Sequence, residues 1–299
     1  MSLNYQPFTS NPHDLSEEEQ ARVMDECMQT AASCTVGLAG LRVKQNQEHV
    51  VSLGSGTSVV IHGQHGILTA THVLHDLPDS GEVGIIQFAD GSDAVPTRPT
   101  IRMEQCGKFI VPGYCGAQLG SDIAFLTLPD TAVAMLESGG MFLNLDRRRD
   151  EALSLPRKGG YCVDGVSGVI GAWTTEEDPE GSFSRVIRFS ALYGVGGLTD
   201  PGMSGDFDFR DVVVSFEHQE NSPPSFGGIS GGGLLRFQFN RENDGTLTKP
   251  VCTPIGVAFW QDFNEKGERL VRSHGPKSLY NVLYDYVGDK LQVVPPSIV

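Results

Sequence analysis

The chain has 299 residues and a mass of 32.2 kDa, enough for one large domain or two packed halves with a sizeable core. Its formal net charge of -15 and isoelectric point near 4.9 argue against a nucleic-acid partner, which needs a concentrated basic face. No apolar stretch reaches the roughly eighteen residues that cross a bilayer, and the N-terminus lacks the basic and apolar regions of a signal peptide. We therefore expect a cytoplasmic protein with no membrane partner.

The cysteines are spread widely along the chain and include no CxxC pair, which disfavours a zinc ribbon or a small disulfide scaffold. Cys106 and Cys115 are spaced closely enough to pair across a hairpin. Free buried thiols in a reducing compartment are the preferred interpretation. The six residues are Cys27, Cys34, Cys106, Cys115, Cys162 and Cys252.

The first predicted element is a helix. Residues 1–14 look irregular, and Ser16 with Glu19 then forms a capping box that opens a helix through about Ala32. From Thr35 the pattern changes to short apolar segments separated by turn residues, which is typical of β-strands. The strands predicted in this half are residues 35–43, 49–53, 57–61, 66–70, 83–88 and 123–128.

A charged segment, Asp146–Gly160, resembles a linker, and we place the boundary between two β halves there. Near the end, Leu279, Val282, Leu283 and Tyr286 recur at helical spacing and predict a short amphipathic helix. The strands predicted in the second half lie near residues 161–163, 168–173, 185–192, 211–217, 233–239 and 254–260. The predicted parts are an N-terminal extension (1–34), two β-barrels (35–150 and 151–275) and a C-terminal helix with a tail (276–299).

Three segments carry groups that could do chemistry. His72 follows a strand that ends in Leu-Thr-Ala-Thr, and Asp122 enters the apolar strand Ile-Ala-Phe-Leu from its polar edge. Taken alone, His72 could be a structural histidine and Asp122 a turn former. If the two lie together and buried, the aspartate would accept the proton on one imidazole nitrogen and fix the tautomer.

The third segment surrounds Ser230 with glycines, in Gly-Gly-Ile-Ser-Gly-Gly-Gly, and leads into a strand. Glycines there allow the sharp turn that presents a hydroxyl, and they let N–H groups converge on a developing oxyanion. The N–H groups of Gly228 and Ser230 are the candidate donors. A plain turn between strands would also be Gly-rich. A phosphate-binding loop is disfavoured because GxxxxGK[ST] and a following helix are missing.

The order His72, Asp122, Ser230, each in its local context, resembles the trypsin-like (chymotrypsin-like) serine peptidase family over roughly residues 35–287. The resemblance implies an all-β fold of two antiparallel six-stranded β-barrels, with an added N-terminal and a C-terminal helix. It also implies a serine endopeptidase acting on a polypeptide through an acyl-enzyme on Ser230, with His72 as general base. No metal or organic cofactor is implied.

The resemblance extends to a substrate-binding strand, which includes Phe259, Trp260 and Gln261. Pro224 occupies the place where members specific for basic residues carry a carboxylate, so cleavage after Arg or Lys is not supported. Gln261 stands where glycine is common and could narrow the pocket, which favours a small or apolar residue before the cut.

Other departures concern redox state and regulation. Val73 follows the histidine where secreted members have cysteine, which fits a reducing compartment. Ile229 precedes the serine where many members have an acid, so the zymogen switch that pairs a new N-terminus with that acid cannot operate.

Two alternatives remain open. Ser204, in Gly-Met-Ser-Gly, is a rival nucleophile that also follows Asp122. The chain could instead be an inactive double barrel that serves as a peptide-binding or scaffold module. An α/β-hydrolase is disfavoured because its triad runs Ser, Asp, His along the chain.

Overall fold

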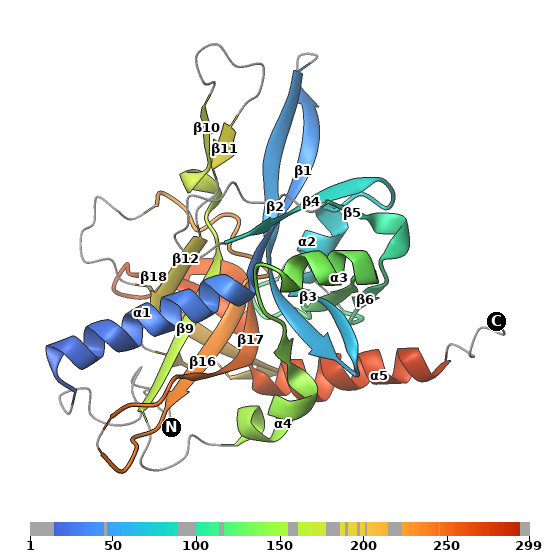
Figure 1. Cartoon of the computed structure of the whole chain (residues 1–299). Helices are drawn as coiled ribbons and strands as arrows, with labels where there is room; N and C mark the ends of the chain where they lie inside the picture. The colour runs from blue at the N-terminus through green and yellow to red at the C-terminus, as the bar shows by residue number, and fades with distance from the viewer. Residues whose placement is uncertain are drawn as a thin grey trace.

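The computed structural model describes residues 15–44, 47–88, 100–113, 117–154, 161–177, 186–188, 191–195, 198–200, 202–214, 223–244 and 246–293. Two curled, mostly antiparallel sheets lie against each other, with helices around them (Figure 1). The predicted all-β class and the chymotrypsin-like double barrel are confirmed. Within the described chain each sheet counts eight strands instead of six, seven in its main order and one short strand, β8 or β14, that pairs off that order.

The first sheet has the strand order β5-β4-β1-β2-β3-β7-β6, and the short β8 pairs parallel to β2. The predicted breaks mostly coincide with strand ends. The two strands predicted at 49–53 and 57–61 are one strand, because Gly54, Ser55 and Gly56 keep pairing with β1. The strands are β1 (Thr35–Lys44), β2 (Gln47–Ile61), β3 (Gln64–Thr69), β4 (Glu82–Gln87), β5 (Thr100–Arg102), β6 (Lys108–Ile110), β7 (Ala124–Thr127) and β8 (Leu143–Asn144).

The second sheet has the order β12-β9-β16-β17-β18-β15-β13, and β14 pairs with β15. The strands predicted at 161–163 and 168–173 were wrong in part, because β9 runs through residue 169 while it pairs with β12 and β16. The strands are β9 (Tyr161–Val169), β12 (Ala191–Val195), β13 (Leu198–Thr199), β14 (Met203–Ser204), β15 (Phe207–Val213), β16 (Gly233–Phe239), β17 (Val251–Phe263) and β18 (Arg269–His274). A separate ribbon joins β10 (Thr175–Glu177) to β11 (Val186–Arg188).

The N-terminal helix α1 (Glu17–Cys34) begins as predicted at a capping box, in which Ser16 Oγ accepts from the Glu19 N–H and Glu19 accepts from the Ser16 N–H. One face is buried at Val23, Cys27 and Ala31. That face packs beside β9 and β12 of the second sheet (Figure 1). α1 therefore contributes side chains to the hydrophobic core.

The segment Asp146–Gly160, predicted as a linker, contains the helix α4 (Leu145–Leu153), which is capped by the Asn144 side chain. Residues 155–160 lie outside the described part. The C-terminal helix is confirmed: a short π-helix, η5 (Ser278–Leu283), continues into α5 (Tyr284–Val293), with Leu279 and Leu283 buried. The sequence did not predict α2 (Thr71–Asp76), α3 (Asp130–Glu137), η2 (Met103–Gln105) or η3 (Gly171–Trp173).

The thiols of Cys27, Cys34 and Cys252 are buried and free, Cys162 is buried, and Cys106 is a partly exposed free thiol. The remaining cysteine, Cys115, lies outside the described residues. Among the helices that the structure describes, none is both long enough and apolar enough to span a membrane.

Candidate functional site

His72 lies one residue into α2, directly after β3. The buried side chains of Ile67 and Leu68 anchor β3 in the first barrel. The Thr71 hydroxyl donates to the Ile123 carbonyl at 3.1 Å, which ties the start of α2 to the segment that carries Asp122. The His72 side chain keeps 35% of its surface exposed, so the ring edge opposite the aspartate can face solvent or a ligand.

Asp122 lies just before β7, and β7 pairs with β3 in the register Thr69↔Ala124. This pairing brings Asp122 to His72 from fifty residues away. The His72 Nδ1 donates to Asp122 Oδ2 at 2.6 Å, and the His72 backbone N–H donates to Oδ1 at 3.0 Å. Both carboxylate oxygens are thus committed to one histidine, and the Asp122 side chain is only 1% exposed.

Opposing influences act on the Asp122 carboxyl. Burial, the largest of them, raises its pKa, but the hydrogen bonds and charge of His72, with a smaller contribution from His274, outweigh it and hold the pKa below the ordinary value. The carboxyl is therefore ionised at neutral pH. Because a carboxylate only accepts hydrogen bonds, His72 Nδ1 carries a proton and Nε2 is left free to accept one.

Ser230 lies on the loop before β16, and this loop is docked on the first barrel. The Ser55 N–H donates to the Ser230 carbonyl at 2.8 Å, and the Ser55 hydroxyl donates to the Gly228 carbonyl at 2.6 Å. At Gly54, the position of a Cβ atom would lie 2.7 Å from Val73 and 3.2 Å from the Ser230 carbonyl. Ser230 is thus held beside the residue that follows His72.

The glycines of this loop are required by its backbone. Gly228 and Gly231 have φ of +98° and +88°, in the left-handed region. A Cβ on Gly231 would lie 2.0 Å from the Ser55 carbonyl oxygen, so no side chain fits there. The Gly231 N–H donates to the Ala258 carbonyl at 2.7 Å, which also fixes the loop to β17.

In the described part of the chain, the N–H groups of Gly228 and Ser230 donate no backbone hydrogen bond. His72 and Asp122 are brought together by two hydrogen bonds, and the Ser230 carbonyl and Val73 both lie against Gly54. Among the described residues no hydrogen bond joins His72 to Ser230. Unliganded catalytic groups often lie at long distance and approach only with substrate.

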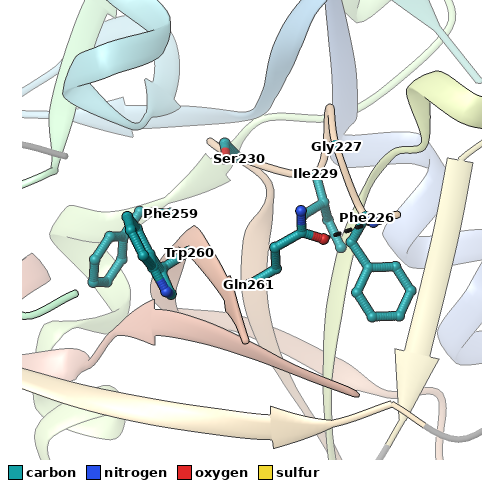
Figure 2. Close-up of a pocket in the computed structure, with 7 residues that line it drawn as sticks. All are labelled: Phe226, Gly227, Ile229, Ser230, Phe259, Trp260 and Gln261. Atoms are coloured by element: carbon teal, nitrogen blue, oxygen red, sulfur yellow. Dashed lines mark hydrogen bonds between the residues drawn. The ribbon is translucent and has the colours of Figure 1, made fainter. Parts of the chain in front are cut away.

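A pocket of about 330 Å³ opens beside Ser230. Phe259, Trp260 and Gln261 come from β17, and Phe226, Gly227 and Ile229 come from the serine loop (Figure 2). The Gln261 amide is fixed across this space, because its Oε1 accepts from the Phe226 N–H at 2.8 Å and its Nε2 donates to Ser225 Oγ at 3.2 Å. Among the described residues that line the pocket, none is charged.

The other two predicted positions lie elsewhere. Pro224 is exposed and does not line this pocket. Ser204 is exposed in β14, where it pairs with Phe207 at the end of a hairpin. Its neighbour Met203 borders a separate depression next to α5. Ser204 has no recorded contact with His72 or Asp122.

Sequence reasoning missed two residues that hold the site together. Ser55 falls in the predicted break between the strands at 49–53 and 57–61, yet its hydroxyl accepts from the Val169 N–H at 2.7 Å and donates to the Gly228 carbonyl, which links both barrels to the serine loop. His274 accepts a hydrogen bond from the Asp122 N–H at 3.0 Å. For Ser55 the flanking glycines were a usable signal, and for His274 there was none.

No protein-family model and no curated protein sequence matches the chain. Solved structures that overlap it include the Drosophila Grass clip serine protease of the Toll pathway, at 14% identity and a TM-score of 0.48, over 88% of this chain and 70% of that one. A catalytically inactive tobacco etch virus protease complexed with substrate overlaps 84% of this chain and 82% of its own, at 11% identity and a TM-score of 0.35.

Structural similarities at this low level of identity give no information on the function of the chain. The strand order defines the chain as a protein with the chymotrypsin-like double-barrel fold. Any chemistry has to be argued from its own residues.

Proposed function

We propose that the chain is a serine endopeptidase with Ser230 as nucleophile, His72 as general base and Asp122 as the orienting acid. The observation that carries the proposal is the pair of hydrogen bonds between His72 and the buried Asp122, next to a glycine-framed serine loop docked on the same barrel. A histidine held in the tautomer that accepts at Nε2 is the group that serine activation needs.

In the proposed reaction, His72 Nε2 takes the Ser230 hydroxyl proton as Oγ attacks a peptide carbonyl. The N–H groups of Gly228 and Ser230, which donate no backbone hydrogen bond among the described residues, stabilise the oxyanion. The imidazolium then gives its proton to the leaving amine, which departs and leaves an acyl group on Ser230. Water, deprotonated by His72, hydrolyses this ester and restores the serine. No cofactor takes part.

The substrate is proposed to be a polypeptide with an apolar residue before the cut. The apolar pocket walls are formed by Phe226, Ile229, Phe259 and Trp260, and the lining residues that the structure describes include no carboxylate to pair with Arg or Lys. The proposed peptidase would act in a reducing compartment, and the free thiols of Cys27, Cys34 and Cys252 support this part of the proposal.

Covalent labelling with a fluorophosphonate probe tests the proposal. We expect the native chain to be labelled at Ser230 by peptide mapping, and labelling to vanish in Ser230→Ala and His72→Ala. Ser204→Ala is the matched control, because Ser204 also sits in a Gly-x-Ser-Gly segment, and it should label like the native chain. Absence of labelling in the native chain would favour the inactive binding module, and labelling at Ser204 would overturn the assignment of the nucleophile.

Gln261 should limit the size of the residue that enters the pocket. In Gln261→Gly the amide bridge to Phe226 and Ser225 is lost and the space that it crosses is opened. We expect kcat/KM for an aromatic residue before the cut to rise roughly tenfold or more relative to alanine, since pocket contacts of this size discriminate by that order. A peptide library varied at that one position measures the ratio, and an unchanged ratio would contradict the role.

A further inference from the structure

His274, the last residue of β18, is fully buried although it is titratable. Its ring packs among three phenylalanines, with centroid distances of 5.5 Å to Phe207, 5.2 Å to Phe209 and 4.6 Å to Phe259. Phe259 also lines the pocket beside Ser230 (Figure 2). An imidazole in such surroundings loses its hydration, so its presence calls for a compensating interaction.

The direction of the hydrogen bond between His274 and Asp122 defines the tautomer of the His274 ring. The Asp122 N–H donates to His274 Nε2 at 3.0 Å, so this nitrogen carries a lone pair and the ring proton is on Nδ1. In the described chain Nδ1 has no partner. Burial, opposed by the charge of Asp122, lowers the pKa of His274 to about 3, so the ring stays neutral at neutral pH.

The hydrogen bond between Asp122 and His274 connects the two barrels at Asp122. Asp122 belongs to the first barrel and His274 to the second, and 152 positions separate them along the chain. Among the described residues His72 supplies the hydrogen bonds to the Asp122 carboxylate, and His274 supplies the bond to its backbone N–H. Without an acceptor at position 274 that buried N–H would be unpaired, and Asp122 would be free to shift.

A role in packing alone does not account for these observations. A phenylalanine or leucine would fill the same apolar space without burying an unpaired Nδ1–H. Only a hydrogen-bond acceptor at this position can bind the Asp122 backbone N–H. A packed ring can do so rigidly, because β18 pairs His274 with Val257, two residues before Phe259.

We propose that His274 is a positioning residue, whose neutral ring holds Asp122 from its backbone side so that both carboxylate oxygens face His72. The proposal rests on the proposed peptidase function only for its effect on turnover. Through Phe259, the same ring also aligns the acid with the wall of the pocket.

The test compares variants that differ in the acceptor. His274→Phe keeps a ring but cannot accept a hydrogen bond, whereas His274→Gln offers an amide oxygen. His65→Gln, a more exposed histidine in the first barrel, is the control. Two quantities are measured: the strongly deshielded proton resonance of His72 Nδ1–H, which needs no activity, and kcat and KM separately for a peptide substrate.

We expect the His72 Nδ1–H resonance to shift or disappear in the Phe variant and to be retained in the Gln variant and the control. The kcat of the Phe variant should fall roughly 10- to 100-fold with KM within about twofold, as expected for a small displacement of a catalytic unit. Substitution by Gln should restore most of kcat.

A folded Phe variant with native resonance and kcat would overturn the proposal, and so would equal impairment in the Phe and Gln variants. If the Phe variant does not fold, His274→Leu against His274→Gln makes the same comparison. If the native chain has no peptidase activity, the proposed function fails, while the resonance still decides whether His274 positions Asp122.

Discussion

The Asp122→Asn variant should fold but lose about 10³- to 10⁴-fold in kcat, because the substitution reverses the tautomer of His72. The backbone N–H of His72 requires an oxygen at the Oδ1 position, so the new NH₂ group must face His72 Nδ1. Nδ1 would then have to accept, and the ring proton would move to Nε2. A protonated Nε2 cannot take the proton of Ser230.

The measurement is kcat on a peptide substrate, together with thermal unfolding to show that the variant is folded. Asp146→Asn is the matched control. Asp146 also accepts two backbone N–H groups, from His62 and Gly63, but lies outside the site. It should leave kcat unchanged. A folded Asp122→Asn protein with kcat within tenfold of the native value would show that Asp122 does not have the orienting role proposed for it.

The strands of the two barrels were largely predictable because their signals are local. Apolar runs bounded by Gly, Pro and Asp marked β3, β7, β16 and β17 within a few residues of their ends. The strand predictions were wrong where hydrogen bonding to a neighbouring strand continues through residues that locally favour a turn. Gly54 to Gly56 looked like a turn, but β1 pairs through it and makes β2 one strand.

Helix α4 was missed for a different reason. Its sequence, LDRRRDEAL, has few apolar residues, so the periodicity that reveals a helix is weak. Its charges are paired instead, Arg148 with Glu151 along the helix and Arg149 with Asp285 of α5. The second of these pairs depends on the fold and cannot be read from a local segment.

Within the site, the three groups proposed for catalysis have local contexts that mark them, but the residues that hold them in place do not. His274 ends an ordinary strand sequence, Arg-Leu-Val-Arg-Ser-His. Its importance depends on the packing of one barrel against the other. A single sequence cannot contain that information, because it is a property of distant residues brought together.

Acid should destabilise the native fold well above the pH at which carboxylates titrate, and His274 should be a main cause. Its pKa is about 3 in the folded state, lowered by burial against the opposing charge of Asp122, and its ordinary value is 6.5. Below pH 6.5 the unfolded chain takes up a proton on this side chain that the folded chain refuses. The contribution of His274 to the free energy of unfolding is therefore fully present above pH 6.5 and is lost progressively toward pH 3.

At pH 4.5 the loss from this one histidine should be roughly 3 kcal/mol, from about 1.4 kcal/mol for each pH unit. Urea unfolding at pH 7 and pH 4.5 measures this difference in the free energy of unfolding. Asp122 does not contribute to it, because its lowered pKa affects stability only at more acid pH. His274→Gln cannot titrate and should lose less stability between these two values by about that amount. His65→Gln, on a more exposed histidine, should match the native chain. An equal pH dependence in the native and His274→Gln proteins would mean that His274 is protonated in the folded state, and its Nε2 could not then accept the Asp122 N–H.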